Sequence, residues 1–565
     1  MAGLAPGLYL PNLPTITPRE RRTFDKWRMN TSSTLRAYRE HDRQWRQRTA
    51  TAAQLPGFLQ LANVAYPGPP ATVILPPNWT PGPPASFRLR PPKDPTDAML
   101  DRIRDIAKRV WDHRKDHEIE FIKIIGHGGQ GIAALFKGPP PLNKYYVVKT
   151  SISTSQQARN TLAAEAAKQR EYLGLVHIVP ALKLYRAHRQ PAYGMQRKMY
   201  SLRRPRPGRS PIEESQAFAP DPTCILEYYP RGSLMKWIRE VGSSISNAIP
   251  PPANDLAAHA MAIPERDLWR IFDCLVKGCI GLEFPPTPAE VEDFTGKNVS
   301  ERMPRLRWKT SSGVHLDLDP SNVLIGDFDE GTHGDIHAVT PALKINDFGL
   351  YEEMADNINN RELYGFWSTR ECGKDKYLTP EQFTDEWDYC RNYPDPGAGF
   401  SVAGNYGPHT NIWGIGATMS DCITLRYPSY PVAEFMTVAG FAGQVATYGG
   451  HLLNCTAVIR GNGAPINQRF PAVVHWSQYS QTLRELVARC LCHDPLHRPD
   501  LKTLQRLVTE GLLAQGPTRA LNRADRRRVD QLIARPPPEP TRLPTELADW
   551  VNRKTPHDNM NPPLH

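Results

Sequence analysis

The run His315-Leu316-Asp317-Leu318-Asp319-Pro320-Ser321-Asn322 is followed further along the chain by Asp347-Phe348-Gly349. Asp317 can orient a hydroxyl group, Asn322 can hold a metal ion, and Asp347, on its glycine turn, can hold another. The triplet at 347–349 occurs often by chance, so the ordered set as a whole carries the argument. These residue types in this order predict phosphoryl transfer from MgATP.

A glycine-rich segment lies upstream of these residues. Residues 121–125 have the apolar, β-branched character of a strand, and they lead into Gly126-His127-Gly128-Gly129-Gln130-Gly131. Without a Cβ, glycine lets backbone amides approach phosphate oxygens, although an ordinary turn gives the same pattern in a chain with 39 glycines. A dinucleotide-binding fold needs a helix after this segment. Residues 132–137 instead have the character of a returning strand, so we predict a β-hairpin that covers a nucleotide.

A lysine and a helical glutamate complete the pattern. The strand predicted over residues 145–149 ends in Lys149, where the ammonium group could reach the α and β phosphates. Residues 156–173 contain no Gly or Pro and are rich in helix-forming residues, which predicts a helix. Glu165 in its middle is the predicted ion-pair partner of Lys149, with Glu171 as the alternative. A solvated helix face is the ordinary position of either glutamate.

The ordered set resembles the eukaryotic protein kinase family over roughly residues 118–513, and it is most similar to fungal protein kinase domains with an HxDLDPxN loop and a TNxWxxG helix start. The resemblance implies an α+β fold of two lobes. The N-lobe, residues 118–229, is expected to be small and β-rich with one main helix. The C-lobe, residues 230–515, is expected to be larger and mostly helical.

Four further landmarks support the resemblance without carrying chemistry. They resemble the fifth strand with the hinge, the end of the activation segment, the start of the long C-lobe helix and a closing element, at residues 224–234, 373–381, 411–416 and 494–499. Thr379 and Asn411 stand where the family usually has Ala and Asp. By the same resemblance, Arg498 is expected to pair with Glu381.

The resemblance also implies roles for individual residues. Asp317 would orient the substrate hydroxyl, and Asn322 and Asp347 would hold magnesium. Lys149, fixed by Glu165, would position the phosphates of ATP. The implied nucleotide-binding residues, with Ala133 in place of the usual valine over adenine and Leu226 at the gatekeeper position, are Gly126, Gly128, Gly131, Ala133, Val147, Lys149, Leu226, Glu227, Tyr229, Ser233 and Leu324.

Two departures from the family pattern bear on activity. Leu316 replaces the arginine that grips a phosphorylated activation segment, so activity should not depend strongly on that phosphorylation. Asp319 replaces the lysine that Ser/Thr kinases place beside the transferred phosphoryl group. Loss of one such donor costs about 2.7–4 kcal/mol, or about 100- to 1000-fold in rate, and a carboxylate adds repulsion.

Asp319 need not silence the site. Tyrosine kinases keep the positive group elsewhere, and the side chain of Asp319 could turn away to cap a backbone amide or meet another cation. Two functions therefore stay open: a protein kinase, with Ser/Thr substrates favoured by Pro320, and a pseudokinase that acts as a nucleotide-binding scaffold through partner binding.

Composition gives the context of this pattern. The chain has 565 residues, a net charge of +11 and a pI near 9.1, so a basic surface is expected. Nucleic acid is not an expected partner, because no RNA-binding aromatic motif or zinc-finger spacing occurs. No 18-residue apolar run or signal pattern occurs, which predicts a cytoplasmic or nuclear protein. Nine cysteines without a CxxC pair predict reduced thiols, and the pair in Cys490-Leu491-Cys492 is expected to pack in the core.

Proline-rich and basic segments flank and interrupt the kinase pattern. Residues 1–94 are rich in Pro and Arg and are expected to be largely disordered, whereas residues 95–117 have the periodicity of a helix that packs on the N-lobe. The tail, residues 516–565, is basic and then Pro-rich, and we expect disorder. Insertions are expected at residues 190–221, 284–309 and 385–408. Partner docking through these extensions, besides protein substrates, is the corresponding hypothesis.

Overall fold

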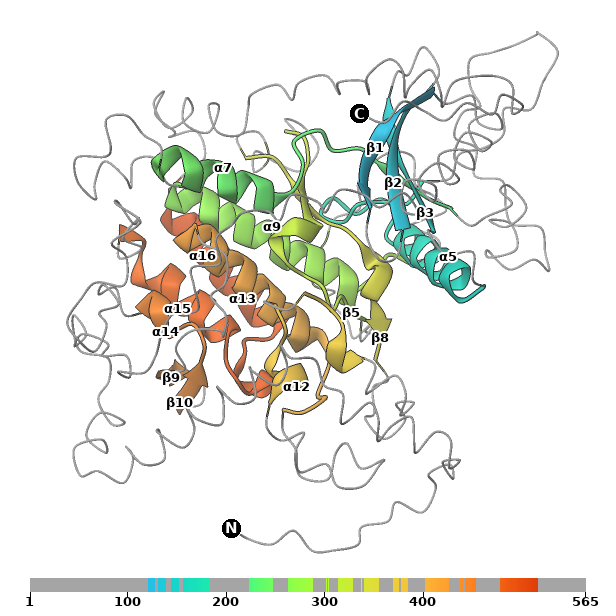
Figure 1. Ribbon diagram of the computed structural model, residues 1–565. Helices are drawn as coiled ribbons and strands as arrows, with labels where there is room; N and C mark the ends of the chain where they lie inside the picture. The colour runs from blue at the N-terminus through green and yellow to red at the C-terminus, as the bar shows by residue number, and fades with distance from the viewer. Residues whose placement is uncertain are drawn as a thin grey trace, which may run out of the picture.

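The computed structural model describes residues 120–127, 131–138, 144–151, 156–182, 223–246, 263–287, 301, 303, 313–328, 337, 340–354, 369–374, 377–384, 402–425, 436–440, 443–453 and 478–516. The predicted N-terminal extension, the helix at 95–117 and the insertion at 190–221 lie outside these residues, as does the tail after residue 516. The other two insertions are described only in part. The described chain is a mixed α+β structure with a sheet and several helices (Figure 1).

A four-stranded antiparallel sheet contains the first strands of the described chain. Its strands run in the order β1-β2-β3-β4, with bounds Glu120–His127, Gly131–Lys137, Tyr145–Ser151 and Thr223–Glu227. Ala133 pairs with Lys149, and Val147 pairs with Leu226. Because side chains alternate along a strand, Val147 and Lys149 lie on one face of β3. The predicted β-hairpin is confirmed, since β1 and β2 pair directly.

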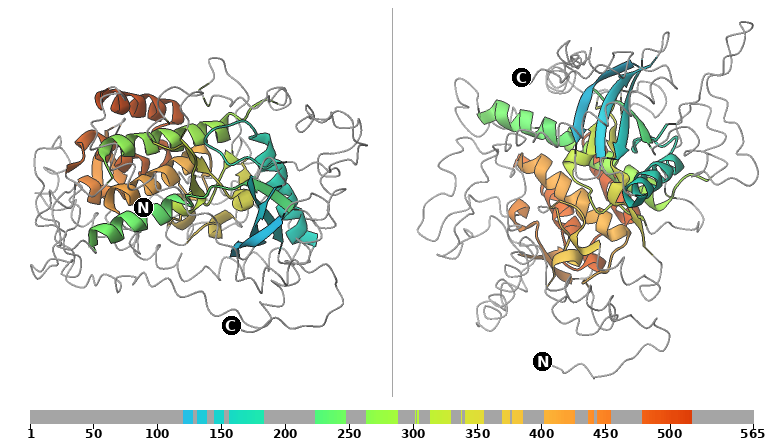
Figure 2. Two further views of the ribbon diagram at one scale, coloured as in Figure 1. Left: turned by 90° about the horizontal axis from the view of Figure 1, so that it is seen from above. Right: turned by 45° about the vertical axis from the view of Figure 1, so that its right-hand side comes forward.

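Helix α5 (Gln156–Glu171) joins this sheet to form what we call the sheet unit, β1–β4 with α5. It contacts β3 and β4 and lies with the sheet to one side of the other helices (Figures 1 and 2). Leu162 and Ala166 on α5 are buried against the apolar side chains of the sheet. The helix predicted over residues 156–173 is therefore confirmed, with its end at Glu171, where a turn through Gly174 (φ 96°) begins.

The remaining helices form the helical unit, α7, α9 and α12–α16. Their bounds are Leu234–Ser246, Glu265–Glu283, Pro380–Phe383, Pro408–Thr424, Gly450–Leu453, Gln481–Cys490 and Leu501–Ala514. Helix α9 lies at the centre, against α13 and α16, and almost all of its residues from 267 to 282 are buried. Side chains of Ser480 and Asp500 accept hydrogen bonds from the backbone at the starts of α15 and α16, which satisfies amides that a helix leaves unpaired.

Short antiparallel strands frame two loops of the helical unit. Strand β5 (Gly313–Val314) pairs with β8 (Glu352–Glu353), and β6 (Val323–Ile325) pairs with β7 (Leu343–Ile345). A further pair, β9 (Met436–Gly440) with β10 (Gly443–Thr447), lies near α14. The loop between β5 and β6 holds residues 315–322, and Asp347 follows β7 closely. These four strands thus bring the loop of residues 315–322 close to Asp347.

The two units meet beside these loops. Ile178, in the segment after α5, forms a parallel bridge with Ile345 of β7. The amide of Val179 donates to the carbonyl of Ile345 at 2.9 Å, and the amide of Ile345 donates to the carbonyl of His177 at 2.8 Å. The backbone therefore connects the sheet unit to the strand that precedes Asp347.

A buried ion pair ties the end of the predicted activation segment to the last helices. Arg498 Nη1 and Nη2 donate to the two carboxylate oxygens of Glu381 at 2.7 and 2.8 Å, and neither side chain is exposed. Burial raises the pKa of Glu381, but Arg498 outweighs burial, so the pKa lies below its usual value. The guanidinium also lies over the ring of Trp413, 5.2 Å from its centroid. The predicted pairing of Arg498 with Glu381 is confirmed.

The sequence predictions on cysteines and on membrane-spanning helices concern, in part, residues that the structure describes. The seven described cysteines are free thiols, and Cys490 and Cys492 are fully buried, as expected for core packing. No helix in the described ranges has the length and apolar character needed to cross a bilayer.

Candidate functional site

Asp317 and Asn322 form a hydrogen-bonded pair in the loop between β5 and β6. The amide Nδ2 of Asn322 donates to the carbonyl and to Oδ2 of Asp317, at 2.8 and 2.7 Å. The second carboxylate oxygen, Oδ1, is buried and accepts no hydrogen bond from the described protein atoms. An orphaned buried acceptor is costly, and a hydroxyl that donates to Oδ1 would satisfy it. Burial raises the pKa of Asp317, Asp319 adds to the rise, and Lys374 opposes it.

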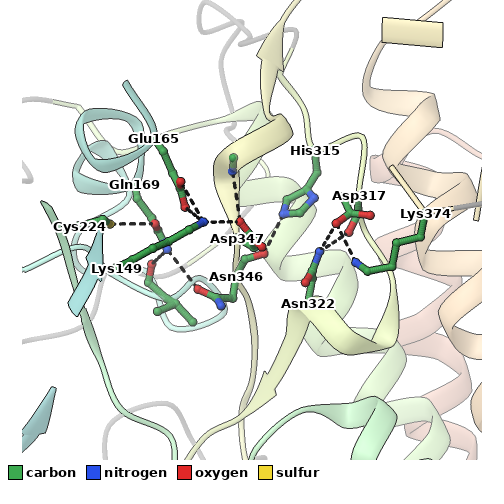
Figure 3. Close-up of polar contacts among 12 residues, drawn as sticks. Lys149, Glu165, Gln169, Cys224, His315, Asp317, Asn322, Asn346, Asp347 and Lys374 are labelled. Atoms are coloured by element: carbon green, nitrogen blue, oxygen red, sulfur yellow. Dashed lines mark hydrogen bonds and ion pairs between the residues drawn. The ribbon is translucent and has the colours of Figure 1, made fainter. Parts of the chain in front are cut away.

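Lys149 joins the sheet unit to the loop after β7. Its Nζ lies 2.7 and 3.0 Å from the carboxylate oxygens of Glu165 and 2.9 Å from Oδ1 of Asp347 (Figure 3). Burial alone would lower the pKa of Lys149, but Glu165 and Asp347 outweigh burial and raise it. Burial raises the pKa of Asp347, and the neighbouring ammonium outweighs that effect and lowers it. Lys149 and Asp347 are therefore both charged at neutral pH.

The structure distinguishes the two glutamates considered for Lys149. Glu165 is buried and contacts Lys149, whereas Glu171 is exposed and pairs with Lys168 at 2.9 Å. Nε2 of the neighbouring Gln169 donates to the backbone carbonyl of Val179 at 3.0 Å and to the side-chain oxygen of Asn346 at 3.4 Å. Helix α5 is thus hydrogen-bonded to the segment that carries Asp347.

The carboxylate of Asp319 is buried and has two partners. Its Oδ1 accepts from the amide of Ser321 at 2.7 Å, and its Oδ2 contacts Nζ of Lys374 at 2.5 Å. The side chain of Asp319 is fully buried, so a cation beside it offsets a large desolvation cost. Both possibilities raised by the sequence, a capped amide and another cation, occur together.

The same lysine also contacts Asp317. Nζ of Lys374 lies 2.7 Å from Oδ2 of Asp317 (Figure 3), and its side chain is 39% exposed. Burial lowers the pKa of Lys374, and the two carboxylates outweigh that effect and raise it. The ammonium group of Lys374 therefore stays charged beside Asp317.

Backbone geometry brings Lys374 to this position. Gly373 has φ 95°, and a Cβ on it would lie 2.4 Å from the carbonyl oxygen of Leu316. Only glycine fits both the conformation and the space. Leu316 itself has φ 58°, a strained value for a residue with a side chain. The conformation of Gly373 and its close approach to Leu316 place Lys374 against the loop of Asp317.

Buried side chains support this loop from behind. Asn411, on α13, donates from Nδ2 to the carbonyl of Gly313 at 2.8 Å and accepts from the amide of His315 at 2.9 Å. His315 Nε2 lies 3.0 Å from the carbonyl of Asn346. Burial lowers the pKa of His315 and outweighs the nearby carboxylates, so the ring is neutral. A single side chain, Asn411, thereby uses both its donor and its acceptor on the start of the loop.

The predicted nucleotide-binding residues lie in several parts of the fold. Val147, Leu226, Tyr229 and Leu324 lie in one apolar cluster that spans the sheet and β6. Ser233 forms a bridge with Leu324 and accepts from the amide of Lys236, and Glu227 accepts from the Tyr229 hydroxyl at 2.7 Å. Ala133 of β2 pairs with Lys149 of β3. Among the glycines, Gly126 has open space where a Cβ would be, and Gly128 lies outside the described residues.

Gly131 has a packing reason that the sequence does not reveal. A Cβ there would lie 2.5 Å from the carbonyl oxygen of Thr150 on β3. The absence of a side chain at this position is therefore required for β2 to pair with β3, independently of any phosphate.

The residues expected to hold magnesium fit that role chemically. Both hydrogen bonds from the Asn322 amide nitrogen go to Asp317, so the amide oxygen is the atom that could meet a cation. The side chain of Asp347 is 40% exposed and is kept ionised by Lys149. Carboxylate and amide oxygens are the donors that Mg²⁺ prefers.

Sequence reasoning did not assign a role to Lys374. Its position in the segment 373–381 was part of the resemblance, and the only signal available was that Asp319, if buried, would need a cation. No protein-family model matches the chain, and a search of curated proteins finds no relative.

Proposed function

We propose that the protein is an ATP-dependent protein kinase that transfers the γ-phosphoryl group to Ser or Thr hydroxyls of protein substrates. The observation that supports this most is the convergence of Lys149, Glu165 and Asp347 with the Asp317–Asn322 pair and Lys374, from five separate segments of the chain. Packing alone does not call for two lysines and four carboxyl or amide groups around one loop junction, whereas phosphoryl transfer uses each of them.

The proposal includes a two-lobed kinase-like fold. In this interpretation the sheet unit is the N-lobe, residues 118–229, and the helical unit belongs to the C-lobe, residues 230–515. The confirmed pair of Arg498 with Glu381, and the contact of Asn411 with the loop of Asp317, support the proposal because both were implied by the resemblance or lie at its landmarks.

The nucleotide would bind between the two units. The apolar cluster of Val147, Leu226 and Leu324 offers surface to the adenine ring, and Lys149 offers a fixed positive charge to the α and β phosphates. Fixed donors in a dry site stabilise charge with little reorganisation. Magnesium, when bound by Asn322 and Asp347, would neutralise phosphate charge.

Asp317 would accept the proton of the substrate hydroxyl. Its Oδ1 is the buried atom without a protein partner, while Asn322 and Lys374 hold Oδ2. A raised pKa makes the carboxylate a stronger base than an exposed aspartate. The two hydrogen bonds to Oδ2 fix the orientation of Oδ1 toward the hydroxyl.

Lys374 would supply the positive charge that Asp319 cannot. Its ammonium lies between Asp319 and Asp317, so the charge would come from the activation segment while Asp319 holds it in place. In this proposal the positive charge comes from Lys374 in another segment instead of from position 319. The ammonium of Lys374 also neutralises the repulsion expected from the Asp319 carboxylate.

A nucleotide-binding scaffold is the second candidate, and Asp319 is the observation that favours it. If Lys374 serves only to compensate two buried carboxylates, the nucleotide could bind without being consumed. Nucleotide binding without phosphoryl transfer is the property that separates this candidate from a kinase.

The test is transfer of labelled γ-phosphate from MgATP to the protein itself and to generic basic and acidic protein substrates. The comparison is wild type, Asp317→Asn and the control Glu240→Gln, whose side chain on α7 is 60% exposed. The proposal predicts transfer in wild type and control, lost in Asp317→Asn, with nucleotide binding retained in all three. Equal counts in wild type and Asp317→Asn, with nucleotide bound, would support the scaffold instead.

A further inference from the structure

Three buried side chains that could bind a metal meet behind the candidate site. The ligand atoms of His177, Cys274 and His337 all lie within 4.8 Å of one another. Each residue is at most 2% exposed. They come from the segment after α5, from the middle of α9 and from the chain before β7, so no sequence spacing could reveal the cluster.

Hydrogen bonds fix which ring nitrogens face inward. Nδ1 of His177 lies 2.5 Å from Oε2 of Glu301, and Nδ1 of His337 lies 3.2 Å from the carbonyl oxygen of Thr340. Both partners accept hydrogen bonds, so each Nδ1 carries a hydrogen. When both rings are neutral, each has a hydrogen on only one nitrogen. Both Nε2 atoms then present lone pairs, and they lie 3.1 Å apart. Two lone pairs at that distance need a cation between them.

The arrangement matches zinc better than it matches a shared proton. Zn–N bonds of about 2.0–2.1 Å in a tetrahedral site place two nitrogens roughly 3.3 Å apart, close to the observed separation of 3.1 Å between His177 and His337. A shared proton would join only the two rings, whereas the Cys274 sulfur lies with both of them within 4.8 Å. Zinc takes thiolate and imidazole ligands together. With a Cys274 thiolate and the Glu301 carboxylate, its two positive charges are balanced inside the core.

The surrounding contacts resemble the outer shell of a metal site. Zinc-bound histidines usually donate their other N–H to a carboxylate or a backbone carbonyl, which is the pattern at His177 and His337. Glu301 also accepts from the amide of His177 at 2.7 Å. The hydroxyl of Thr340 donates to Asp267 on α9 at 2.7 Å, which holds the carbonyl that His337 contacts.

We propose that His177, Cys274 and His337 bind a structural zinc ion. The ion would join the segment after α5 to α9 and to the chain that leads into β7. The carbonyl of His177 already accepts from the amide of Ile345 at 2.8 Å, so the zinc would lock the junction of the sheet unit with the strand preceding Asp347. The inference does not depend on phosphoryl transfer.

The test uses the full chain, purified without chelators and without a metal-binding tag. Metal content is measured by mass spectrometry for wild type, Cys274→Ser and the control Cys279→Ser, which removes another fully buried thiol of α9. The proposal predicts about one zinc per chain in wild type and control, and almost none in Cys274→Ser. Replacement of zinc by cobalt should give a thiolate-to-cobalt absorption band that Cys274→Ser lacks.

A second measurement keeps the test decisive if Cys274→Ser does not fold. Melting of wild type is followed with and without a strong zinc chelator. The proposal predicts a lower melting temperature with chelator, restored by added zinc. Wild-type protein that folds with far less than one equivalent of any metal, shows no thiolate-to-cobalt band and melts unchanged with chelator would overturn the proposal and leave a shared proton between His177 and His337.

Discussion

Asp319 and Lys374 decide how the candidate site is interpreted at the scale of single residues. A buried carboxylate without a cation is strongly destabilising, and Asp319 is fully buried against Lys374. Lys374 also contacts Asp317. One ammonium group therefore both compensates Asp319 and lies beside the proposed base, which makes the departure at position 319 compatible with activity.

The pH dependence of activity should report on this contact. Asp317 must be deprotonated to accept a hydroxyl proton, so the rate falls as the pH drops below its pKa, which burial raises. Lys374 lowers that pKa, so Lys374→Met should move the acidic limb of kcat/KM to higher pH. The profile of residual activity measures the limb. An acidic limb that does not move, or that moves to lower pH, would contradict the assigned contact.

At this scale the sequence singled out candidate residues and two of their partners, since the pairs Lys149–Glu165 and Glu381–Arg498 are confirmed. Asp317, Asn322 and Lys149 could be singled out because the chemistry needs those residue types in that order. The partner of Asp319 could not, because Lys374 is brought close by the conformation of Gly373 and by strain at Leu316. Neither property can be read from a linear pattern.

At the scale of elements, α5 separates Glu165 from Glu171. Glu165→Gln should lower kcat, because Lys149 loses its charged partner and is free to pair with Asp347 alone. Glu171→Gln on the exposed face should change it little, since a surface pair contributes about 0–1 kcal/mol. Steady-state rates of the two variants, with melting temperatures as a folding check, test this. The reverse order of effects would remove Glu165 from the site.

Asn411 makes α13 a direct support of the loop that holds Asp317. Asn411→Asp should destabilise the fold by about 1–3 kcal/mol, because the carbonyl of Gly313 loses a buried donor. Chemical denaturation of this variant measures the loss, and Lys502→Ala on the exposed part of α16 is a suitable control. A variant as stable as wild type would mean that the bond to Gly313 contributes nothing to stability.

The predicted elements illustrate what hydrophobic patterns can determine. The strand expected over residues 121–125 extends to 120–127, and the strand over 145–149 extends to 145–151. Periodicity identifies each element because one face must be buried, but the boundaries depend on pairing. The final two residues of each strand are held by antiparallel register, which a single segment does not encode.

At the scale of the whole molecule, the Glu381–Arg498 pair links distant segments. Arg498→Met leaves a buried carboxylate without its cation and should destabilise the fold by about 3–5 kcal/mol. Arg506→Met, which removes an exposed partner of Glu510, should cost about 0–1 kcal/mol. Thermal or denaturant unfolding compares the two. Equal losses would show that the buried pair has no special weight.

The same pair predicts how stability depends on pH. The folded pKa of Glu381 is below its usual value. Its contribution is therefore present above the unfolded pKa and is lost as the pH falls through the folded pKa. Glu381→Gln should show a smaller loss of stability than wild type over this acidic window. A larger loss in the variant would contradict the direction of the shift.

The larger arrangement was accessible from sequence only in outline. An α+β fold with a sheet followed by helices could be predicted from the order of motifs. The junction through Ile178 and Ile345, and the cluster of His177, Cys274 and His337, could not. Such contacts depend on three-dimensional packing between segments that share no periodicity.

The most direct test of the account is the rate of γ-phosphoryl transfer from MgATP by Lys374→Met, compared with wild type, Lys374→Arg and the exposed-lysine control Lys236→Met. Loss of the relocated charge should lower the rate about 100- to 1000-fold, with Lys374→Arg retaining more activity and Lys236→Met unchanged. Transfer by Lys374→Met at the wild-type rate, or no transfer by folded wild-type protein that binds MgATP, would contradict the claim that Lys374 makes this site catalytic.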